Sequence, residues 1–215
     1  MVMNMSKWSD LYEEEISKTT IEAYVNEKLR TKKEIIKLID KYVKNGSVLE
    51  LGSGTGVLAC KISSMGKSVI ALDRDADMIS LSKKYFEGYF KDCDITYINK
   101  DIMDFKSKDK IDVIYSIGIL EHYSDDEIIK LLNKQLSISD YVIFGIPTRY
   151  FDENKKMYGN ERYLRIKDWR VLITKTNGEL IEESHYHYLN WYQRIFKISK
   201  YFKPYPVHVF VLKRK

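Results

Sequence analysis

The sequence predicts an α/β fold, a doubly wound and mostly parallel sheet with helices on both faces, an antiparallel C-terminal strand and an N-terminal helical cover. Short apolar runs alternate with helical patterns from residue 48 to residue 146, which is typical of parallel strands joined by helical crossovers. The chain has 215 residues, which is long enough for one core and short for two. Its hydrophobic fraction of 44% and charged fraction of 31% are those of a globular protein. We therefore expect a single domain over residues 1–215.

Residues 1–45 have a helical character and are expected to form the cover. In the segment TKKEIIKLIDKYV (31–43) the apolar residues share one broad stripe at helical spacing. The segment KNGS follows directly. Gly46 is expected to end the helix there, in a left-handed conformation.

Residues 46–146 carry the alternating pattern and are expected to form the parallel part of the sheet. The apolar runs have the length of buried strands, and most are followed by a segment with helical spacing. Strands are expected at 48–51, 68–72, 95–98, 111–116 and 141–146, and helices at 56–65, 75–86 and 125–136.

The C-terminal part of the chain has a different pattern. Residues 147–167 show no clean period and are expected to form a lid or insert, whereas residues 168–215 complete the sheet. The two expected strands in this part alternate in polarity, which favours antiparallel pairing. Helices are expected at 168–175 and 191–202, and strands at 179–188 and 207–213.

The composition excludes several classes of protein. No run of about 18 apolar residues is present, so no membrane span is expected. The N-terminus lacks the basic start and apolar block of a secretory signal. Cys60 and Cys93 form neither a CxxC pair nor a disulfide framework, and we expect a reduced, cytoplasmic location. The net charge of +5 is scattered among acidic residues, which disfavours a nucleic-acid partner.

A glycine-rich segment, VLELGSGTGVLA (48–59), follows the first strand and indicates a nucleotide-like site. Glycine lets the backbone approach a ligand closely and adopt positive φ. A dinucleotide fingerprint would need a third glycine where Val57 stands, and no Gly-Lys-Ser/Thr phosphate loop is present. Glu50, two residues before the first glycine, is poorly placed for a pyrophosphate and suits a ligand with a cationic group. These features argue against a nicotinamide-dependent oxidoreductase.

Four motifs in order resemble those of the class I S-adenosylmethionine-dependent methyltransferases, and in particular the small-molecule members. They are VLELGSGTG, then VIALDRDADMI, then NKDIMDF (99–105), and finally IDVIYSIGILEHYSDDE (111–127). Together they extend over roughly residues 30–146, at spacings that such domains show. The resemblance implies a Rossmann-like fold, S-adenosylmethionine as cofactor and S-adenosylhomocysteine as its product. Residues 46–146 would then be the cofactor-binding core.

The resemblance also implies which residues bind the cofactor. Asp73 would accept both ribose hydroxyls, Asp101 the adenine amine, and Glu50 would hold the methionine amino group. Met78 either packs on the adenine or fills the core. Tyr24 and Arg30, on the N-terminal helical cover, correspond to positions that cover the methionine end. The full predicted cofactor set is Tyr24, Arg30, Glu50, Gly52, Ser53, Gly54, Asp73, Arg74, Met78, Asp101, Ile102, Ser116 and Ile117.

His122 is the candidate general base, because it follows the fourth strand at the edge where the methyl group would lie and histidine as a residue type suits proton transfer. The alternative is that EHYSDDE begins a helix, with Ser124 and Glu127 as a capping box, and that His122 only shapes the pocket. His185, His187 and His208 lack acidic or cysteine partners at ligand spacing, so no metal is expected.

The acceptor is expected to be a small molecule methylated on oxygen or nitrogen, because an aromatic-rich cap could enclose it. The segment SIGIL has no Asp/Asn-Pro-Pro-aromatic motif and no Pro-Cys nucleophile is present, which disfavours nucleic-acid base methylation. Three alternatives stay open: an RNA methyltransferase, a protein methyltransferase, and a non-catalytic binding subunit. The oligomeric state is open between monomer and homodimer.

Overall fold

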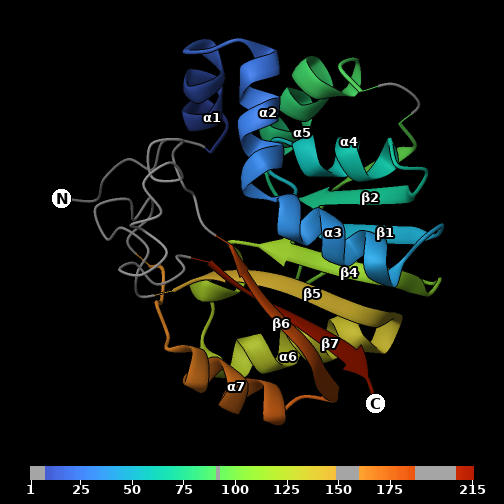
Figure 1. Ribbon diagram of the computed structural model, residues 1–215, viewed down its shortest axis with the longest axis vertical. Helices are drawn as coiled ribbons and strands as arrows, with labels where there is room; N and C mark the ends of the chain where they lie inside the picture. Colours follow the sequence, from blue (N-terminus) through green and yellow to red (C-terminus); the bar gives the residue numbers. More distant parts are fainter. Residues whose placement is uncertain (1–7, 91–92, 149–159, 187–206) are drawn as a thin grey trace, which may run out of the picture.

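The computed structural model describes residues 8–90, 93–148, 160–186 and 207–215. Its centre is a seven-stranded sheet in the order β3-β2-β1-β4-β5-β7-β6, with helices on both faces (Figure 1). Strands β1 to β5 are parallel, and β7 is antiparallel to both β5 and β6. The strand order reverses between β1 and β4, which is where a doubly wound sheet opens a crevice at its carboxyl edge. The predicted fold class is confirmed.

The strands begin and end within about two residues of the predicted positions, because buried apolar runs bounded by turn residues specify them closely. Strands β6 and β7 confirm the two alternating segments near the C-terminus. The predicted helix at 191–202 lies outside the described residues, as do 149–159 of the predicted lid. The strands are β1 Ser47–Leu51, β2 Ser68–Asp73, β3 Ile95–Asn99, β4 Ile111–Ile117, β5 Ser139–Pro147, β6 Gly178–Tyr186 and β7 Val207–Arg214.

The helices also follow the predicted order. Helix α6 begins with the predicted capping box, in which the Ser124 hydroxyl and the Glu127 side chain cap each other's backbone. Helix α5 continues into a single turn of wider, π-type helix at Lys83–Glu87. The helices are α1 Trp8–Ser17, α2 Ile21–Thr31, α3 Lys33–Tyr42, α4 Val57–Ser63, α5 Ala76–Ser82, α6 Asp125–Ile138 and α7 Ile166–Thr174, with a 3₁₀ turn at Leu120–His122.

Two apolar layers hold the helices on the sheet. On one face, α3 and α4 pack on the central strands through residues such as Leu38 and Ile62. On the other face, α6 and α7 pack on β5 and β7 around Trp169, which is fully buried and lies 6.0 Å from the Phe144 ring. Burial on both faces explains why the parallel strands read as continuous apolar runs rather than as alternating ones.

The N-terminal helices α1 and α2 form the predicted cover over α4 and α5 (Figure 1). Thr20 caps α2 by accepting the Ala23 N–H, and the ring of Tyr24 stacks on Phe86. These contacts bring α2 beside the segment that follows the first strand.

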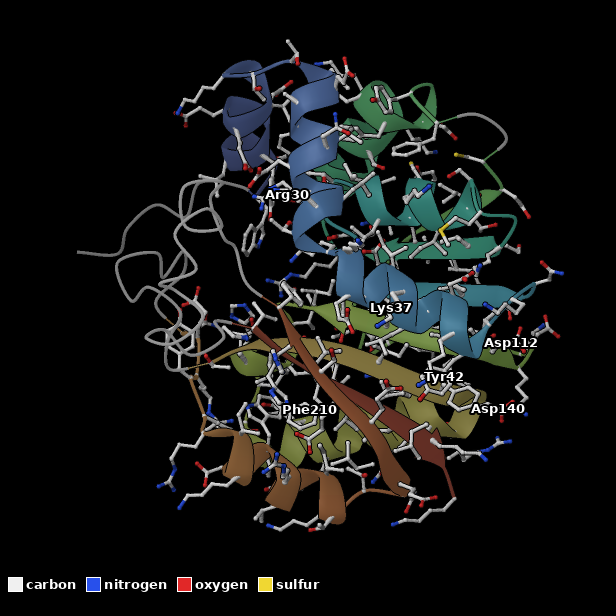
Figure 2. The ribbon with its side chains drawn as sticks, in the orientation of Figure 1. Arg30, Lys37, Tyr42, Asp112, Asp140 and Phe210 are labelled. Atoms are coloured by element: carbon white, nitrogen blue, oxygen red, sulfur yellow. The ribbon has the colours of Figure 1, made fainter. Side chains whose placement is uncertain are left out.

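Gly46 does not end the preceding helix in a left-handed conformation, so that prediction is wrong. Helix α3 already ends at Tyr42, and Val43 after it is extended. A Cβ at Gly46 would lie 2.5 Å from Asp112 Oδ2, the atom that accepts the Ser47 N–H at 2.8 Å. Glycine is needed there for this close approach, at the amino end of the sheet where Figure 2 shows Asp112.

Gly56 and Gly66 provide a matched pair of positions for testing how closely the start of α4 packs against α5. Both have positive φ, but a Cβ at Gly56 would lie 1.9 Å from Ser82 Oγ, whereas nothing lies within 4 Å at Gly66. Gly66→Ala should cost about 1–2 kcal/mol of stability from backbone strain. Gly56→Ala should cost about 1–3 kcal/mol more, because α4 and α5 must separate. Urea unfolding of both variants measures the difference, and equal losses would contradict the packing role of Gly56.

Candidate functional site

The candidate site lies at the carboxyl edge of the sheet, where the strand order reverses. Two turns meet there: the glycine loop after β1 (residues 52–56) and the turn after β4 (residues 118–122). A Cβ at Gly52 would lie 2.3 Å from Ile119 Cδ1, so the two turns are in contact. The reversal leaves the space above β1 and β4 free of a crossover connection, which makes this edge the natural ligand position.

The glycine loop is fixed by hydrogen bonds to the end of β2. The N–H groups of Gly52 and Ser53 donate to the Leu72 carbonyl at 2.8 and 3.0 Å. Gly54 has a φ of 54°, and a Cβ there would meet only the Cε of Met78, at 4.0 Å. Among the described residues, only this methyl group comes near the space beside Gly54, and the bare backbone faces room for a ligand.

Asp73, the last residue of β2, presents a carboxylate that the backbone holds in place. Its Oδ2 accepts the Gly54 N–H and its Oδ1 accepts the Asp75 N–H, both at 2.9 Å. Burial raises the pKa of Asp73, and these two N–H groups oppose that shift. Each carboxylate oxygen has a second lone pair, so the group can still accept hydrogen bonds from a ligand.

Glu50 is a second buried carboxyl group, on β1 just below the loop. Its side chain is almost fully buried and its Oε2 has no hydrogen-bond partner within the described chain. Burial, together with the charge of Asp73, raises the pKa of Glu50 to about 8, although Tyr115 and Lys32 oppose the shift. An unpartnered buried carboxyl oxygen is costly, so its presence indicates a site for a cationic or hydrogen-bond-donating ligand group.

Three of the predicted cofactor residues lie along β2, β3 and the segments after them. Met78 is 1% exposed, and its Cε would lie 4.0 Å from a Cβ at Gly54, on the open side of the glycine loop. Asp101 is half-buried, and its Oδ1 accepts the Met103 N–H at 2.8 Å. The side chain of Ile102 packs between two apolar layers. The carboxylate of Asp101 is thus oriented by its own turn.

Three further predicted residues lie near the same edge. Ser116 is buried at the end of β4, opposite Leu51 in the strand register, and Ile117 is half-buried beside it. The exposed Arg74 follows Asp73, and its carbonyl accepts a hydrogen bond from the side chain of Asn99 at 2.9 Å. These positions place Ser116 and Ile117 next to the glycine loop and Arg74 at the rim.

The two predicted residues of the helical cover differ in their surroundings. Tyr24 is buried with its hydroxyl near Thr55 of the glycine loop; burial raises the pKa of Tyr24, and Thr55 opposes that shift. Arg30 projects from the flank of α2 (Figure 2), and its guanidinium lies 2.9 Å from Glu27 of the same helix. Tyr24 thus reaches the loop, while Arg30 is held by Glu27.

His122 lies in the turn after β4 and is half-buried. Its Nδ1 is 2.8 Å from Oδ1 of Asn160, which belongs to the segment before α7. The Asn160 oxygen can accept a hydrogen bond from Nδ1, and in that tautomer Nε2 keeps its lone pair. This contact is compatible with the tautomer that a base needs, and the capping box predicted as the alternative exists beside it.

Residues that the sequence motifs did not assign also converge on this edge. Glu121 is 4% exposed, and its Oε2 has no hydrogen-bond partner within the described chain. Burial raises the pKa of Glu121 to about 8, the charge of Glu161 adds to the shift, and Lys32 opposes it. A glutamate directly after the apolar run SIGIL was the available signal for Glu121. Lys32 and Glu161 are distant in sequence and gave none.

Two arginines before α7 and one of the C-terminal histidines are already paired. Arg162 pairs with Asp125 and donates to the Tyr123 carbonyl, and Arg165 pairs with Asp168. His208 bonds to Glu183 at 2.8 Å, and burial lowers the pKa of His208. Among the described residues, no group of three or more histidine, cysteine, aspartate or glutamate side chains could hold a metal ion. No described helix is both long and apolar enough to cross a membrane.

Comparisons with known proteins agree with this geometry. Residues 48–138 match the family model described as a methyltransferase domain. Ubiquinone biosynthesis O-methyltransferase of Pelagibacter ubique (strain HTCC1062) is 31% identical over 102 residues, which are 47% of this chain and 42% of that protein. This chain spans about half the length of the first curated relatives it matches.

Solved structures show the same fold. Magnesium protoporphyrin IX methyltransferase from Synechocystis PCC 6803, with bound S-adenosylmethionine, has a TM-score of 0.65 at 13% identity, covering 88% of this chain and 80% of that one. The N-methyltransferase NodS from Bradyrhizobium japonicum WM9, in complex with S-adenosylhomocysteine, has a TM-score of 0.62 at 12% identity, covering 85% and 84%.

The buried carboxyl groups predict a specific pH dependence of stability. Glu50 and Glu121 keep their protons in the folded state up to about pH 8, whereas in the unfolded chain they ionise around pH 4.5. The folded state thus binds more protons between these values, so stability should fall as pH rises through this window, by up to about 1.4 kcal/mol per pH unit for each group. Urea unfolding from pH 5.5 to 7.5 measures the slope.

Glu50→Gln should flatten this slope, because an amide does not ionise. Glu22, which is exposed on α2, provides the matched control, and Glu22→Gln should leave the slope unchanged. A wild-type stability that is constant or rises over this range would contradict the burial of ionisable carboxyl groups.

Proposed function

We propose that this chain is a class I S-adenosylmethionine-dependent methyltransferase, and that it transfers a methyl group from S-adenosylmethionine to an oxygen or nitrogen of a small-molecule acceptor. The match of residues 48–138 to a methyltransferase domain and the shared fold support the proposal. The proposal rests on two carboxyl groups beside the open glycine loop, one held in place by the backbone and one buried with an oxygen that the described chain does not satisfy. Asp73 is held by two N–H groups, and within the described chain Glu50 has a buried oxygen without a hydrogen-bond partner.

These residues fit the cofactor in three respects. The carboxylate of Asp73 can accept the two ribose hydroxyls, because its oxygens are fixed and retain free lone pairs. Glu50 can take the ammonium of the methionine part, and that bond would remove the cost of its orphaned oxygen. The open side of Gly54 leaves room for the ribose and its neighbours. Asp101, Ile102 and Met78 would enclose the adenine.

The remaining predicted residues would complete the cofactor site. Ser53 Oγ is buried without a hydrogen-bond partner within the described chain, and it lies in the loop that would contact the methionine part. Ser116 and Ile117 would line its floor, with Tyr24 above the loop and Arg74 at the rim. Arg30 would need to exchange its partner Glu27 to reach the ligand.

The cofactor supplies an activated methyl group on a sulfonium, so this chain's own residues have only to align the acceptor, exclude water and receive a proton. His122 is proposed to receive it at Nε2, because Asn160 keeps the proton on Nδ1. A neutral imidazole is basic enough for this step near neutral pH.

A binding measurement tests the cofactor assignment. Calorimetric titration should show one-to-one binding of S-adenosylhomocysteine and no binding of NAD. Gly54→Val should abolish this binding, because its side chain fills the open space beside the loop. Gly66→Val is the control, since Gly66 has a similar positive φ but lies away from the loop. Normal binding by Gly54→Val would refute the loop assignment.

A kinetic measurement tests the base. His122→Ala should lower kcat by about 10²–10⁴-fold with an acceptor found by screening, which is the usual contribution of a general base. Cofactor affinity should stay unchanged in the same variant. Turnover at the wild-type rate would leave His122 as part of the pocket wall only.

A further inference from the structure

An arginine in the segment before α7 contacts the backbone on both sides of the candidate base. The N–H of Arg162 donates to the Glu121 carbonyl at 2.9 Å, and its guanidinium donates to the Tyr123 carbonyl. Glu121 and Tyr123 are the two residues that flank His122 in the chain. One residue, distant in sequence, therefore holds the turn after β4 immediately before and immediately after His122.

The guanidinium of Arg162 is itself held by an acidic side chain at the start of α6. One of its nitrogens pairs with Asp125 Oδ1, while the other makes the contact with the Tyr123 carbonyl. A guanidinium presents its donors in a rigid fork, so two partners at once fix its orientation. The two paired side chains are 34% and 54% exposed, so the ion pair adds little to stability. Its effect is geometric, because it fixes the segment before α7 against the turn.

The same segment brings an amide group to the imidazole ring. Asn160 lies two residues before Arg162, and its Oδ1 is 2.8 Å from Nδ1 of His122. Among the described residues, Asn160 is the one hydrogen-bond partner of this ring. The hydrogen bond at one ring nitrogen sets which nitrogen carries the proton. The contacts that hold Asn160 in place therefore also act on the tautomer of His122.

We propose that Arg162 is a positioning residue for His122, which keeps Asn160 against Nδ1 and so leaves the lone pair of Nε2 available to the acceptor. The inference rests on the proposed function, because it concerns the base of that reaction. In the other tautomer Nε2 would carry the proton and could not receive another. Loss of the Arg162 side chain should therefore impair turnover, whereas the proposed cofactor residues keep their own contacts.

The test observes the tautomer of His122 directly. Protein labelled with ¹⁵N-histidine is studied by NMR at about pH 8, where an ordinary imidazole is neutral. The His122 signals are those missing from His122→Ala. The ring ¹⁵N shifts of the wild-type protein should place the proton on Nδ1. Arg162→Ala and Asn160→Ala should each move the ring toward the form protonated on Nε2, and the double variant should move it no further, because both changes remove the same interaction.

Arg165→Ala is the matched control. Arg165 belongs to the same segment, but its guanidinium pairs with Asp168 of α7, so the wild-type tautomer should persist. With an acceptor found by screening, Arg162→Ala should lower kcat by up to about 10²-fold, the cost of a misplaced catalytic group. Arg162→Lys, which keeps the charge facing Asp125 but not the fork, should lower kcat less. Affinity for S-adenosylhomocysteine should stay unchanged in all of these variants.

A wild-type ring protonated on Nε2 would overturn the inference, as would an unchanged tautomer in Arg162→Ala or an equal change in Arg165→Ala. If Arg162→Ala does not fold, Arg162→Gln, which keeps most of the side-chain length but not the fork, replaces it under the same criteria. The calorimetric titration with S-adenosylhomocysteine separates the two levels of failure. Its failure removes the proposed function, whereas binding together with an unchanged tautomer in the Arg162 variant removes only the positioning role.

Discussion

The two backbone hydrogen bonds to the carboxylate of Asp73 are the constraint on which the site depends. One comes from Gly54 in the loop after β1 and the other from Asp75, the residue that caps α5. The loop after β1 and the start of α5 after β2 are thereby tied to one side chain. Because Gly52 and Ser53 also donate to Leu72, the loop keeps its shape without a ligand and its open side at Gly54 is preformed. Preorganisation of this kind lowers the entropic cost of binding.

The same edge of the sheet contains groups that oppose folding. Glu50 and Glu121 are buried carboxyl groups, each with an oxygen that the described chain does not satisfy. Fully apolar residues at these positions would pack on the surrounding strands at a lower desolvation cost. The fold bears this desolvation cost because the apolar layers around α3, α4, α6 and α7 stabilise both faces of the parallel sheet. Unsatisfied groups of this kind are expected at binding sites, where a ligand completes them.

Glu50 and Glu121 have separate environments, which suits two different ligand parts. Glu50 lies below the glycine loop beside Asp73, and Glu121 lies on the facing turn beside His122 and Glu161. Lys32, at the junction of α2 and α3, acts on both. The break between these helices thus has a consequence for the site, since it brings the charge of Lys32 to act on both buried carboxyl groups.

The sequence by itself determined the order of strands and helices, the glycine loop and the identity of Asp73 and Glu50 as candidate ligands. Local patterns specify these features, because apolar period, turn residues and capping boxes act over a few residues. Tertiary structure alone decided that Gly46 approaches Asp112, that Trp169 is buried in the core, and that Arg162 and Arg165 are paired. It also brought Lys32 and Glu161 to Glu121. Such convergence depends on which strand ends meet at one edge, and no local pattern encodes which side chains will then face each other.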